Sequence, residues 1–448
     1  MNSDANAPPL ADVLRVAAAA WARFRAGTSL DRALEQALAS KAPTPHPRLA
    51  AAAKDVVYTA TRNLALIDAA IDHLATRTPD AAVAGLAAVS LAQLLTQRHA
   101  DYAVVDQAVR AAKADAATRM ASGFINALLR RWLRECDALR PELERDEVVR
   151  FNAPRWWIDR VRAVHPQRAD AIFDLQRRPP PLVLRVNRRR TAVAAYLERL
   201  QRMGISAVQV GPHAVRLHAP RPVEAIPGFG DGDVSVQDAG AQLAADWLGV
   251  CDGMRVLDAC AAPGGKTAQL AEIADLDLDA VEIDPGRAAR IESNLERTSA
   301  RAHARIRVIV ADACMPRTFA PLLGYHRILI DAPCTASGIV RRHPDIPWLR
   351  RPADVAQLAT LQARLADALW PLLLPAGRLL YVVCSLFPEE GVRQAERFAA
   401  RWPDARAVPL TAGTQAFVQL LPGEIAPAHG GELPTVHDGF FFALFEKS

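Results

Sequence analysis

The first third of the chain has hydrophobic residues spaced as on one face of successive α-helices. The first such face consists of Leu10, Val13, Leu14, Ala17, Trp21 and Phe24. Further helices are predicted over residues 56–74, over the alanine-rich run 81–97 and over residues 104–132, and no segment alternates as a strand does. We therefore expect residues 1–145 to form an all-α helical bundle.

The pattern changes between residues 146 and 235. A strand is predicted over residues 182–187, a helix over 192–203, and two short strands around Val208 and Val215. This mixture predicts a small α/β domain. A turn rich in glycine and proline at residues 226–230 separates it from the rest of the chain.

From residue 236 to the end, predicted strands alternate with helical segments. The strands are expected at residues 255–259, 280–284, 305–311, 327–331 and 378–384. Such a rhythm is typical of a parallel, doubly wound sheet with helices on both faces. Residues 236–448 are thus predicted to form an α/β Rossmann-like domain, which makes the chain a multidomain protein.

Composition excludes wholesale disorder, and charge adds one local feature. Of the 448 residues, 51% are hydrophobic and 23% charged, and the formal net charge is only +5. Residues 155–190, however, hold ten arginines against three aspartates, a local excess of +7. A concentrated basic stretch is what phosphate neutralisation requires, so it favours a nucleic acid partner, although a solvated arginine-rich surface accounts for it equally well.

Cysteine usage and the N-terminal sequence indicate the compartment. The six cysteines form no CxxC pair and have no histidine at metal-binding spacing, which argues against a zinc site and a secreted disulfide framework. The first residues lack a signal peptide pattern, and the run 81–97 is too polar for a membrane span. We expect a cytoplasmic monomer without a metal ion.

A glycine-containing loop after the first strand of the last domain is a candidate cofactor site. Residues 258–267 read DACAAPGGKT, a strand end running into a helix start. A P-loop would need glycine where Cys260 stands, and GxGxxG is absent, so neither phosphate-binding motif fits. An ordinary tight turn is the alternative interpretation of this loop.

Acidic residues at the ends of the next strands favour a cofactor over an ordinary turn. Glu282 and Asp284 end the second strand, Asp312 the third and Asp331 the fourth. Carboxylates in this crevice accept hydrogen bonds from ribose hydroxyls and attract cations. S-adenosylmethionine, with its ribose, ammonium and sulfonium, suits such a pocket.

Two cysteines follow neighbouring strands of the same predicted sheet. Cys334 lies beyond the fourth strand and Cys384 beyond the fifth. A single cysteine is usually a small buried hydrophobe, but two beside a cofactor loop suit methylation of cytosine at carbon 5, in which a thiolate adds to carbon 6. Asp331 would stabilise the adduct and Lys266 the thiolate. These residues alone do not decide which thiol attacks.

Three strings resemble motifs of the RNA cytosine-5 methyltransferases of the Sun/Nop2 family. They are DACAAPGGKT at 258–267, DAPCTASG at 331–338 followed by RRHPD at 341–345, and VCS at 383–385 followed by PEE at 388–390. The resemblance implies that Cys384 is the nucleophile and that Cys334 assists release. It also implies cofactor contacts from Cys260, Ala261, Ala262, Pro263, Gly264, Gly265, Lys266, Glu282, Asp284, Asp312 and Asp331. Relatives often carry aspartate where this chain has Glu282.

The remaining parts of the chain extend the resemblance to nearly its whole length. Residues 121–131, ASGFINALLRR, are similar to the NusB-like RNA-binding domain of bacterial members that act on 16S ribosomal RNA, and residues 180–187, PPLVLRVN, to the family's RNA-binding linker domain. The implied substrate is therefore a cytosine in 16S ribosomal RNA. Transfer RNA or another RNA is the alternative substrate, and a non-catalytic NusB-like RNA-binding or antitermination factor is the alternative function.

Overall fold

The computed structural model describes residues 8–41, 47–320, 324–410, 416–424 and 433–448. The chain forms two compact units. One consists of Met1–Arg178 together with Val340–Arg350, and the other of Pro179–Ile339 together with Arg351–Ser448. The second unit contains both the small domain and the large sheet.

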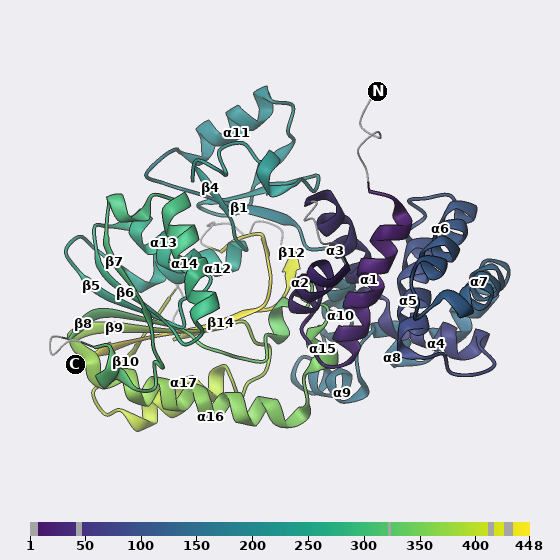
Figure 1. The fold of residues 1–448 in the computed structure, drawn as a ribbon. Helices are drawn as coiled ribbons and strands as arrows, with labels where there is room; N and C mark the ends of the chain where they lie inside the picture. Colours follow the sequence, from purple (N-terminus) through teal and green to yellow (C-terminus); the bar gives the residue numbers. More distant parts are fainter. Residues whose placement is uncertain (1–7, 42–46, 321–323, 411–415, 425–432) are drawn as a thin grey trace. The chain divides into compact units, whose positions relative to one another are not determined.

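The first unit is helical, as the hydrophobic spacing predicts. Its helices are α1 (Leu10–Arg25), α2 (Leu30–Lys41), α3 (Pro47–Arg62), α4 (Leu64–Leu74), α5 (Ala81–Thr96), α6 (Asp101–Ala114), α7 (Ser122–Leu143), α8 (Glu147–Phe151), α9 (Arg155–Val164), α10 (Ala169–Arg177) and the short α15 (Ile346–Leu349). The alanine-rich α5 is buried along most of its length, because small side chains let α1, α3 and α6 pack closely around it. The helical bundle is confirmed (Figure 1).

The single helix predicted over residues 104–132 is wrong, because the chain turns between α6 and α7. The Thr118 hydroxyl donates to the Ala112 carbonyl at 2.9 Å near the end of α6. The Asp115 carboxylate accepts from the Ala117 N–H at 3.1 Å. Side chains that bond to nearby main-chain groups offer an alternative to the helical ladder. The break contains no proline, and the hydrophobic spacing does not change there, so the sequence pattern predicted one continuous helix.

A segment from the later half of the sequence completes the helical unit. The Asp345 carboxylate accepts from the Leu30 N–H at 3.0 Å and so caps the start of α2. Arg62 donates to the Arg341 carbonyl at 3.1 Å, and Trp348 packs against the helical core. Residues 340–350 belong to this unit although more than 160 residues of the other unit precede them.

The small domain begins the second unit. Its elements are β1 (Leu182–Val186), α11 (Val193–Arg202), β2 (Ala207–Gln209), β3 (Ala214–Leu217) and β4 (Val234–Val236). The strands form an antiparallel sheet in the order β2-β3-β1-β4. The predicted strands and helix are confirmed, and β4 is an addition, since three residues are too few to show alternation.

The large sheet has helices on both faces (Figure 1). Its elements are α12 (Ala239–Leu248), β5 (Arg255–Ala259), α13 (Gly265–Ile273), β6 (Asp277–Glu282), α14 (Pro285–Arg297), β7 (Arg305–Val310), β8 (Tyr325–Asp331), α16 (Pro352–Leu369), β9 (Leu373–Val383), α17 (Val392–Arg401), β10 (Ala405–Val408), β11 (Phe417–Leu420) and β14 (Phe440–Lys447), besides the small pair β12 (Gly423–Glu424) and β13 (Val436–His437). Strand order is β10-β14-β9-β8-β5-β6-β7, with β11 also paired to β14.

The sheet is parallel from β9 to β7, as predicted, but mixed overall. The strand β14 runs antiparallel to β9, and β10 and β11 run antiparallel to β14. Six successive buried residues of β14, from Phe440 to Phe445, pack into the cores on both faces of the sheet. A continuous apolar strand of this kind is stable only in the interior of a sheet, which explains the extension beyond β9.

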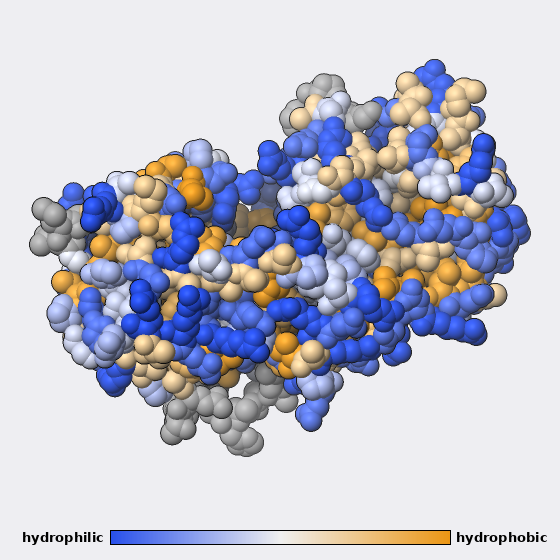
Figure 2. Space-filling model, turned by 90° about the horizontal axis from the view of Figure 1, so that it is seen from below, coloured by the Kyte–Doolittle hydropathy of each residue, from blue (hydrophilic) through white to orange (hydrophobic). Residues whose placement is uncertain are grey.

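The hydropathy of the surface and of the helices bears on what a membrane-spanning segment requires. On the face shown in Figure 2, hydrophilic residues predominate and hydrophobic ones lie in small scattered groups. None of the helices in the described ranges combines the length and the apolar character that crossing a membrane requires.

Candidate active site

Both predicted cysteines lie together at one edge of the large sheet. Cys334 follows β8 and Cys384 follows β9, and these strands are parallel neighbours in which Asp331 pairs with Val382. Their carboxyl ends therefore meet, and the two sulfur atoms are 3.4 Å apart. Cys334 is buried, whereas Cys384 is partly exposed. The hydrogen bond with Cys384, together with burial, raises the pKa of the Cys334 thiol.

Main-chain bonds hold the two cysteine loops against each other. The Ala332 N–H donates to the Val382 carbonyl and the Gly338 N–H to the Cys384 carbonyl, each at 2.9 Å. A Cβ atom on Gly338 would lie 2.2 Å from the carbonyl oxygen of Gly439, so only glycine fits there. The separation of the sulfur atoms is therefore set by the sheet and its loops.

Glu390 accepts hydrogen bonds from the residue that follows each cysteine, Thr335 after Cys334 and Ser385 after Cys384. Its carboxylate accepts from the Thr335 N–H at 2.8 Å, from the Thr335 hydroxyl at 2.6 Å and from the Ser385 hydroxyl at 2.5 Å, and Gln362 adds a further donor at 3.2 Å. Burial raises the pKa of Glu390 although these bonds act to lower it. In the sequence, Glu390 stood only as the end of a family-like string, and its position between the two loops required the fold.

Lys266 and Asp331 form an ion pair near the cysteines. The Lys266 Nζ lies 2.6 Å from an Asp331 carboxylate oxygen. Burial opposes the charge of Lys266, but Asp331, Asp258 and Cys384 outweigh it and raise the pKa of the ammonium. The charged Lys266 ammonium is thus a cation close to Cys384.

The loop that joins β5 to α13 has the close-packed form of a ligand-binding turn. Cys260 has a φ of +63° and Gly264 a φ of +93°, and a Cβ on Gly264 would lie 3.0 Å from the Ile291 Cα. The Ala261 N–H donates to the Val281 carbonyl at 2.9 Å, which anchors the loop to β6. Burial raises the pKa of Cys260, so this third thiol stays neutral.

The carbonyl groups of the same loop face α14. The Ala262 carbonyl accepts from Arg287 at 3.4 Å, and the Pro263 carbonyl accepts from the Asn294 side chain at 2.8 Å. Gly265 is the first residue of α13. Because side chains of α14 bond to these carbonyls, the shape of the loop is fixed. The N-terminus of α13, whose first N–H groups have no partner within the helix, then lies at the crevice.

Two buried carboxylates in this crevice have an oxygen atom without a protein partner. Asp258 accepts from the Thr267 hydroxyl at 2.6 Å through Oδ2, but its Oδ1 has no partner among the described residues. Glu282 accepts from the Asp284 N–H at 3.1 Å through Oε1, while its Oε2 likewise has none in the described part of the chain. Buried acceptors of this kind fit a ligand that brings hydroxyl or ammonium donors.

Asp258 lies in the 258–267 string, but the cofactor contacts that the sequence implied begin at Cys260 and do not include it. Burial raises the pKa of Asp258 to about 7, although the Thr267 hydroxyl acts to lower it. The only signal in the sequence was its place at the end of β5, one strand before the acids that were identified. Its orphan oxygen became visible only with the fold.

The other two predicted acids are bonded to main-chain donors. Asp284 caps α14 by accepting from the Arg287 N–H at 2.8 Å. Asp312 accepts from the Cys314 N–H at 2.8 Å. Both lie at strand ends on the same edge as Glu282, as their sequence spacing predicts, and each also shapes the loop that follows its strand.

The arginine-rich stretch 155–190 has many partners inside the fold. In the first unit, Arg155 and Arg162 pair with Glu147 at 2.5 and 2.6 Å. The pairs in the second unit are Arg185 with Glu272, Arg188 with Asp246, Arg189 with Asp275 and Arg190 with Asp233. The local excess of positive charge is thus partly offset by acids distant in the sequence, so the count of arginines overstates the charge offered to a polyanion.

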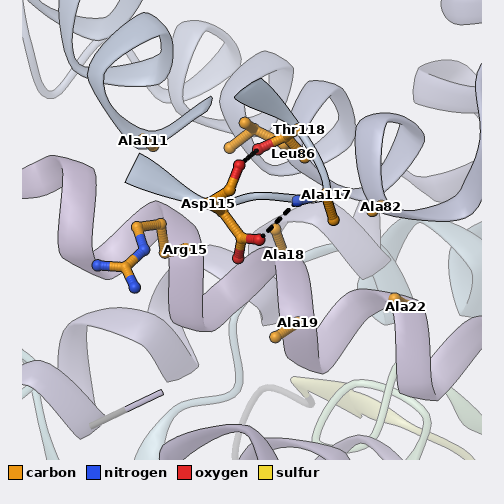
Figure 3. Close-up of a pocket in the computed structure, with 10 residues that line it drawn as sticks. All are labelled: Arg15, Ala18, Ala19, Ala22, Ala82, Leu86, Ala111, Asp115, Ala117 and Thr118. Carbon is orange, nitrogen blue, oxygen red and sulfur yellow. Dashed lines mark hydrogen bonds between the residues drawn. The ribbon is translucent and has the colours of Figure 1, made fainter. Parts of the chain in front are cut away.

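A pocket in the helical unit is unrelated to this chemistry. Figure 3 shows alanines of α1, α5 and α6 around it, with Arg15 and Asp115 at its side. It contains no cysteine, histidine or lysine. Across the described ranges, no group of three or more histidine, cysteine or acidic side chains is arranged to hold a metal ion.

Comparisons with known proteins agree with this architecture domain by domain. Family models match residues 13–134 as the NusB family, residues 153–224 as the ferredoxin-like domain of RsmF/B-like methyltransferases, and residues 245–446 as the 16S rRNA methyltransferase RsmB/F. The last match contains the cofactor loop and both cysteine loops.

Individual relatives extend along most of the chain. Ribosomal RNA small subunit methyltransferase B of Cronobacter sakazakii is 39% identical over 363 residues, which cover 80% of this chain and 81% of that protein. The solved structure of PH0851 covers 98% of this chain and 99% of its own, with a TM-score of 0.77 and 23% identity. NSun6 from Pyrococcus horikoshii, solved with the S-adenosylmethionine analogue SFG, covers 66% of this chain and 98% of its own, with a TM-score of 0.54 and 16% identity. The resemblance noted in the sequence is confirmed, and the chain belongs to the RsmB/F family of 16S rRNA methyltransferases.

Proposed function

We propose that this protein methylates carbon 5 of a cytosine in 16S ribosomal RNA, using S-adenosylmethionine and a covalent enzyme–RNA adduct. The observation that carries the proposal is the pair of sulfur atoms 3.4 Å apart beside the ion pair of Lys266 and Asp331. The substrate is inferred from the relatives, which are named small-subunit ribosomal RNA methyltransferases. The partly exposed Cys384 is the attacking thiol.

Cys384 makes carbon 5 reactive. Its thiolate sulfur forms a bond to carbon 6, and the electron pair of the carbon 5–carbon 6 double bond moves to carbon 5. Lys266, held charged close to Cys384, is the cation that would stabilise negative charge on the attacking sulfur. Asp331, anchored by Lys266, faces the base and stabilises the adduct through the nitrogen edge of the ring. The base must leave its stack to reach these groups.

Cys334 assists the release of the product. After methylation, a base removes the proton on carbon 5, the freed electron pair restores the double bond, and the Cys384 sulfur departs as a thiolate. The Cys334 sulfur lies 3.4 Å from the Cys384 sulfur, and its raised pKa keeps it a protonated thiol that can donate a hydrogen bond to the departing sulfur. In its absence, the adduct should form and persist.

The cofactor would be held by the β5–α13 loop and the acids around it. S-adenosylmethionine supplies an electrophilic methyl group on a sulfonium when bound. The Glu282 Oε2 would accept from ribose hydroxyls and the Asp258 Oδ1 from a cationic donor, since neither atom has a partner among the residues that the structure describes. The exposed side chain of Ile283, next to Glu282, offers an apolar surface to a base ring. Residues 260–266, Asp284, Asp312 and Asp331 complete the contacts.

The test is adduct trapping combined with methyl transfer on defined RNAs. Wild-type protein should methylate 16S ribosomal RNA, as naked fragment or assembled subunit, in preference to transfer RNA. Cys384→Ser should abolish transfer and adduct, while Cys334→Ser should accumulate a protein–RNA adduct that survives denaturing electrophoresis. Full activity of Cys384→Ser would refute the assigned roles, and preference for transfer RNA would refute the substrate.

A further inference from the structure

Arg185 is a fully buried arginine that connects the small domain to the start of the cofactor helix. It lies on β1, and only 1% of its side chain is exposed. Its Nε and Nη2 donate to both carboxylate oxygens of Glu272 on α13, at 3.0 and 2.6 Å. Its Nη1 donates to the Gln237 side-chain oxygen at 2.5 Å and to the Gly265 carbonyl at 2.8 Å.

Stability alone gives little reason for this arrangement. Removing an arginine and a carboxylate from water carries a desolvation cost that their mutual attraction roughly balances, and apolar residues of similar size often serve as well. What an apolar residue cannot supply is the bond to the Gly265 carbonyl. That bond is specific to the planar guanidinium fork, which reaches a carboxylate and a main-chain carbonyl at the same time.

The position of the Gly265 carbonyl affects both the loop before it and Lys266 after it. Gly265 follows Gly264, whose φ is +93°, and precedes Lys266, which pairs with Asp331. The opposite end of the loop is fixed by the bond from the Ala261 N–H to β6. Arg185 therefore anchors the α13 end of the loop, while Ala261 anchors its other end and the bonds to α14 hold the carbonyls between them.

A second arginine holds the other end of the same helix. Arg189, which follows β1, donates to the Ala271 carbonyl at 2.9 Å and pairs with Asp275 at 2.7 Å. Helix α13 ends at Ile273. Arg185 and Arg189, four residues apart in the small domain, thus bond to α13 near its first and last residues. These bonds fix both the position of the helix along its axis and the tilt of the helix.

We propose that Arg185 is a positioning residue for S-adenosylmethionine, so that the small domain forms part of the cofactor site by holding the Gly265 carbonyl and the 260–266 loop. This inference rests on the proposed function, in which that loop binds the cofactor. It assigns Arg185 a task distinct from binding RNA, although it belongs to the arginine-rich stretch.

The experiment measures S-adenosylmethionine affinity by calorimetry on the full-length protein, with thermal unfolding recorded for each variant. Arg185→Met/Glu272→Met removes both charges together and leaves neither unpaired. Arg378→Met/Glu446→Met is the control, because it removes a partly exposed arginine–glutamate pair at 2.9 Å in the same unit, together with the bond from Arg406 to Glu446, away from the loop. Arg185→Lys keeps a positive charge beside Glu272 but lacks the guanidinium group that bonds Glu272 and the Gly265 carbonyl together. This single variant replaces the double variant in the measurement if the double variant does not fold.

We expect the Kd of Arg185→Met/Glu272→Met to rise about tenfold or more, with that of Arg185→Lys in between and the control equal to wild type. In methyl-transfer assays the KM for the cofactor should rise while the KM for RNA stays unchanged, a split that general destabilisation does not produce. Unaltered cofactor affinity in folded Arg185 variants would overturn this inference alone. Failure of wild-type protein to bind the cofactor would overturn the proposed function itself.

Discussion

The buried carboxyl of Asp258 should make the stability of the protein fall as pH rises through neutrality. Asp258 is completely buried, and its pKa is raised from 3.8 to about 7. Between these values the folded chain keeps a proton that the unfolded chain has lost. Stability falls with pH wherever the native state binds more protons, so the contribution of the neutral carboxyl is complete below pH 3.8 and lost by about pH 7.

The size of the effect follows from the displacement of the pKa. Each factor of ten in proton affinity corresponds to about 1.4 kcal/mol, so the whole loss is on the order of 4 kcal/mol. About 3 kcal/mol of it should fall between pH 5 and pH 8. Asp258→Asn has no proton to lose, and its stability relative to wild type should therefore improve by that amount over this interval.

Urea unfolding of the full chain at pH 5 and pH 8 measures the effect, since other titrating groups change both proteins alike. Thr267→Val is a useful comparison, because it keeps the carboxyl but removes the hydroxyl that acts to lower its pKa. Its loss of stability on going to pH 8 should exceed that of wild type. An identical change from pH 5 to pH 8 in wild type and Asp258→Asn would refute the reasoning.

Three further predictions concern the cysteine loops. Glu390→Ala should lower the free energy of unfolding by about 1–3 kcal/mol in chemical denaturation, because it leaves buried donors unpaired, whereas Glu389→Ala, which removes a partly exposed pair with Arg393, should change it by less than about 1 kcal/mol; equal effects would contradict the network. Diamide should oxidise Cys334 and Cys384 to one disulfide, seen in peptide mass spectra as the loss of two hydrogens, since their sulfur atoms are 3.4 Å apart; absence of the cross-link would contradict that separation. Gly338→Ala should lower the thermal midpoint and methyl transfer together, because its Cβ would meet a carbonyl oxygen at 2.2 Å; wild-type behaviour would show that the loop can move aside.

Strand ends were predictable from the sequence because their signals are local. The parallel strands β5, β6, β8 and β9 each have a buried apolar run, and Asp331, Cys334 and Cys384 come at or just after the ends of such runs. Parallel neighbours bring their carboxyl ends to one edge, so Cys334, Cys384, Lys266 and Asp331 could be grouped before any coordinates were known. The strand order that makes β8 and β9 adjacent came from the fold.

Contacts between distant segments were not predictable. The pairing of Arg185 with Glu272 spans 87 residues, and the cap that Asp345 places on α2 spans 315. A hydrophobic period reports which face of an element is buried, but not which residue meets it there. Counting charges along the chain therefore left two interpretations of the basic stretch, and neither showed that many of its arginines are bonded to acids within the protein.

The sequence by itself determined the helical and α/β halves, and it singled out the candidate cofactor loop and the two candidate cysteines, because periodicity and strand-end motifs are properties of neighbouring residues. Only the tertiary structure decided the 3.4 Å between the thiols, the place of Glu390 between their loops and the orphan oxygens of Asp258 and Glu282. Distance, burial and the absence of a partner are properties of the packed chain, and they arise only when segments far apart in sequence exclude water together.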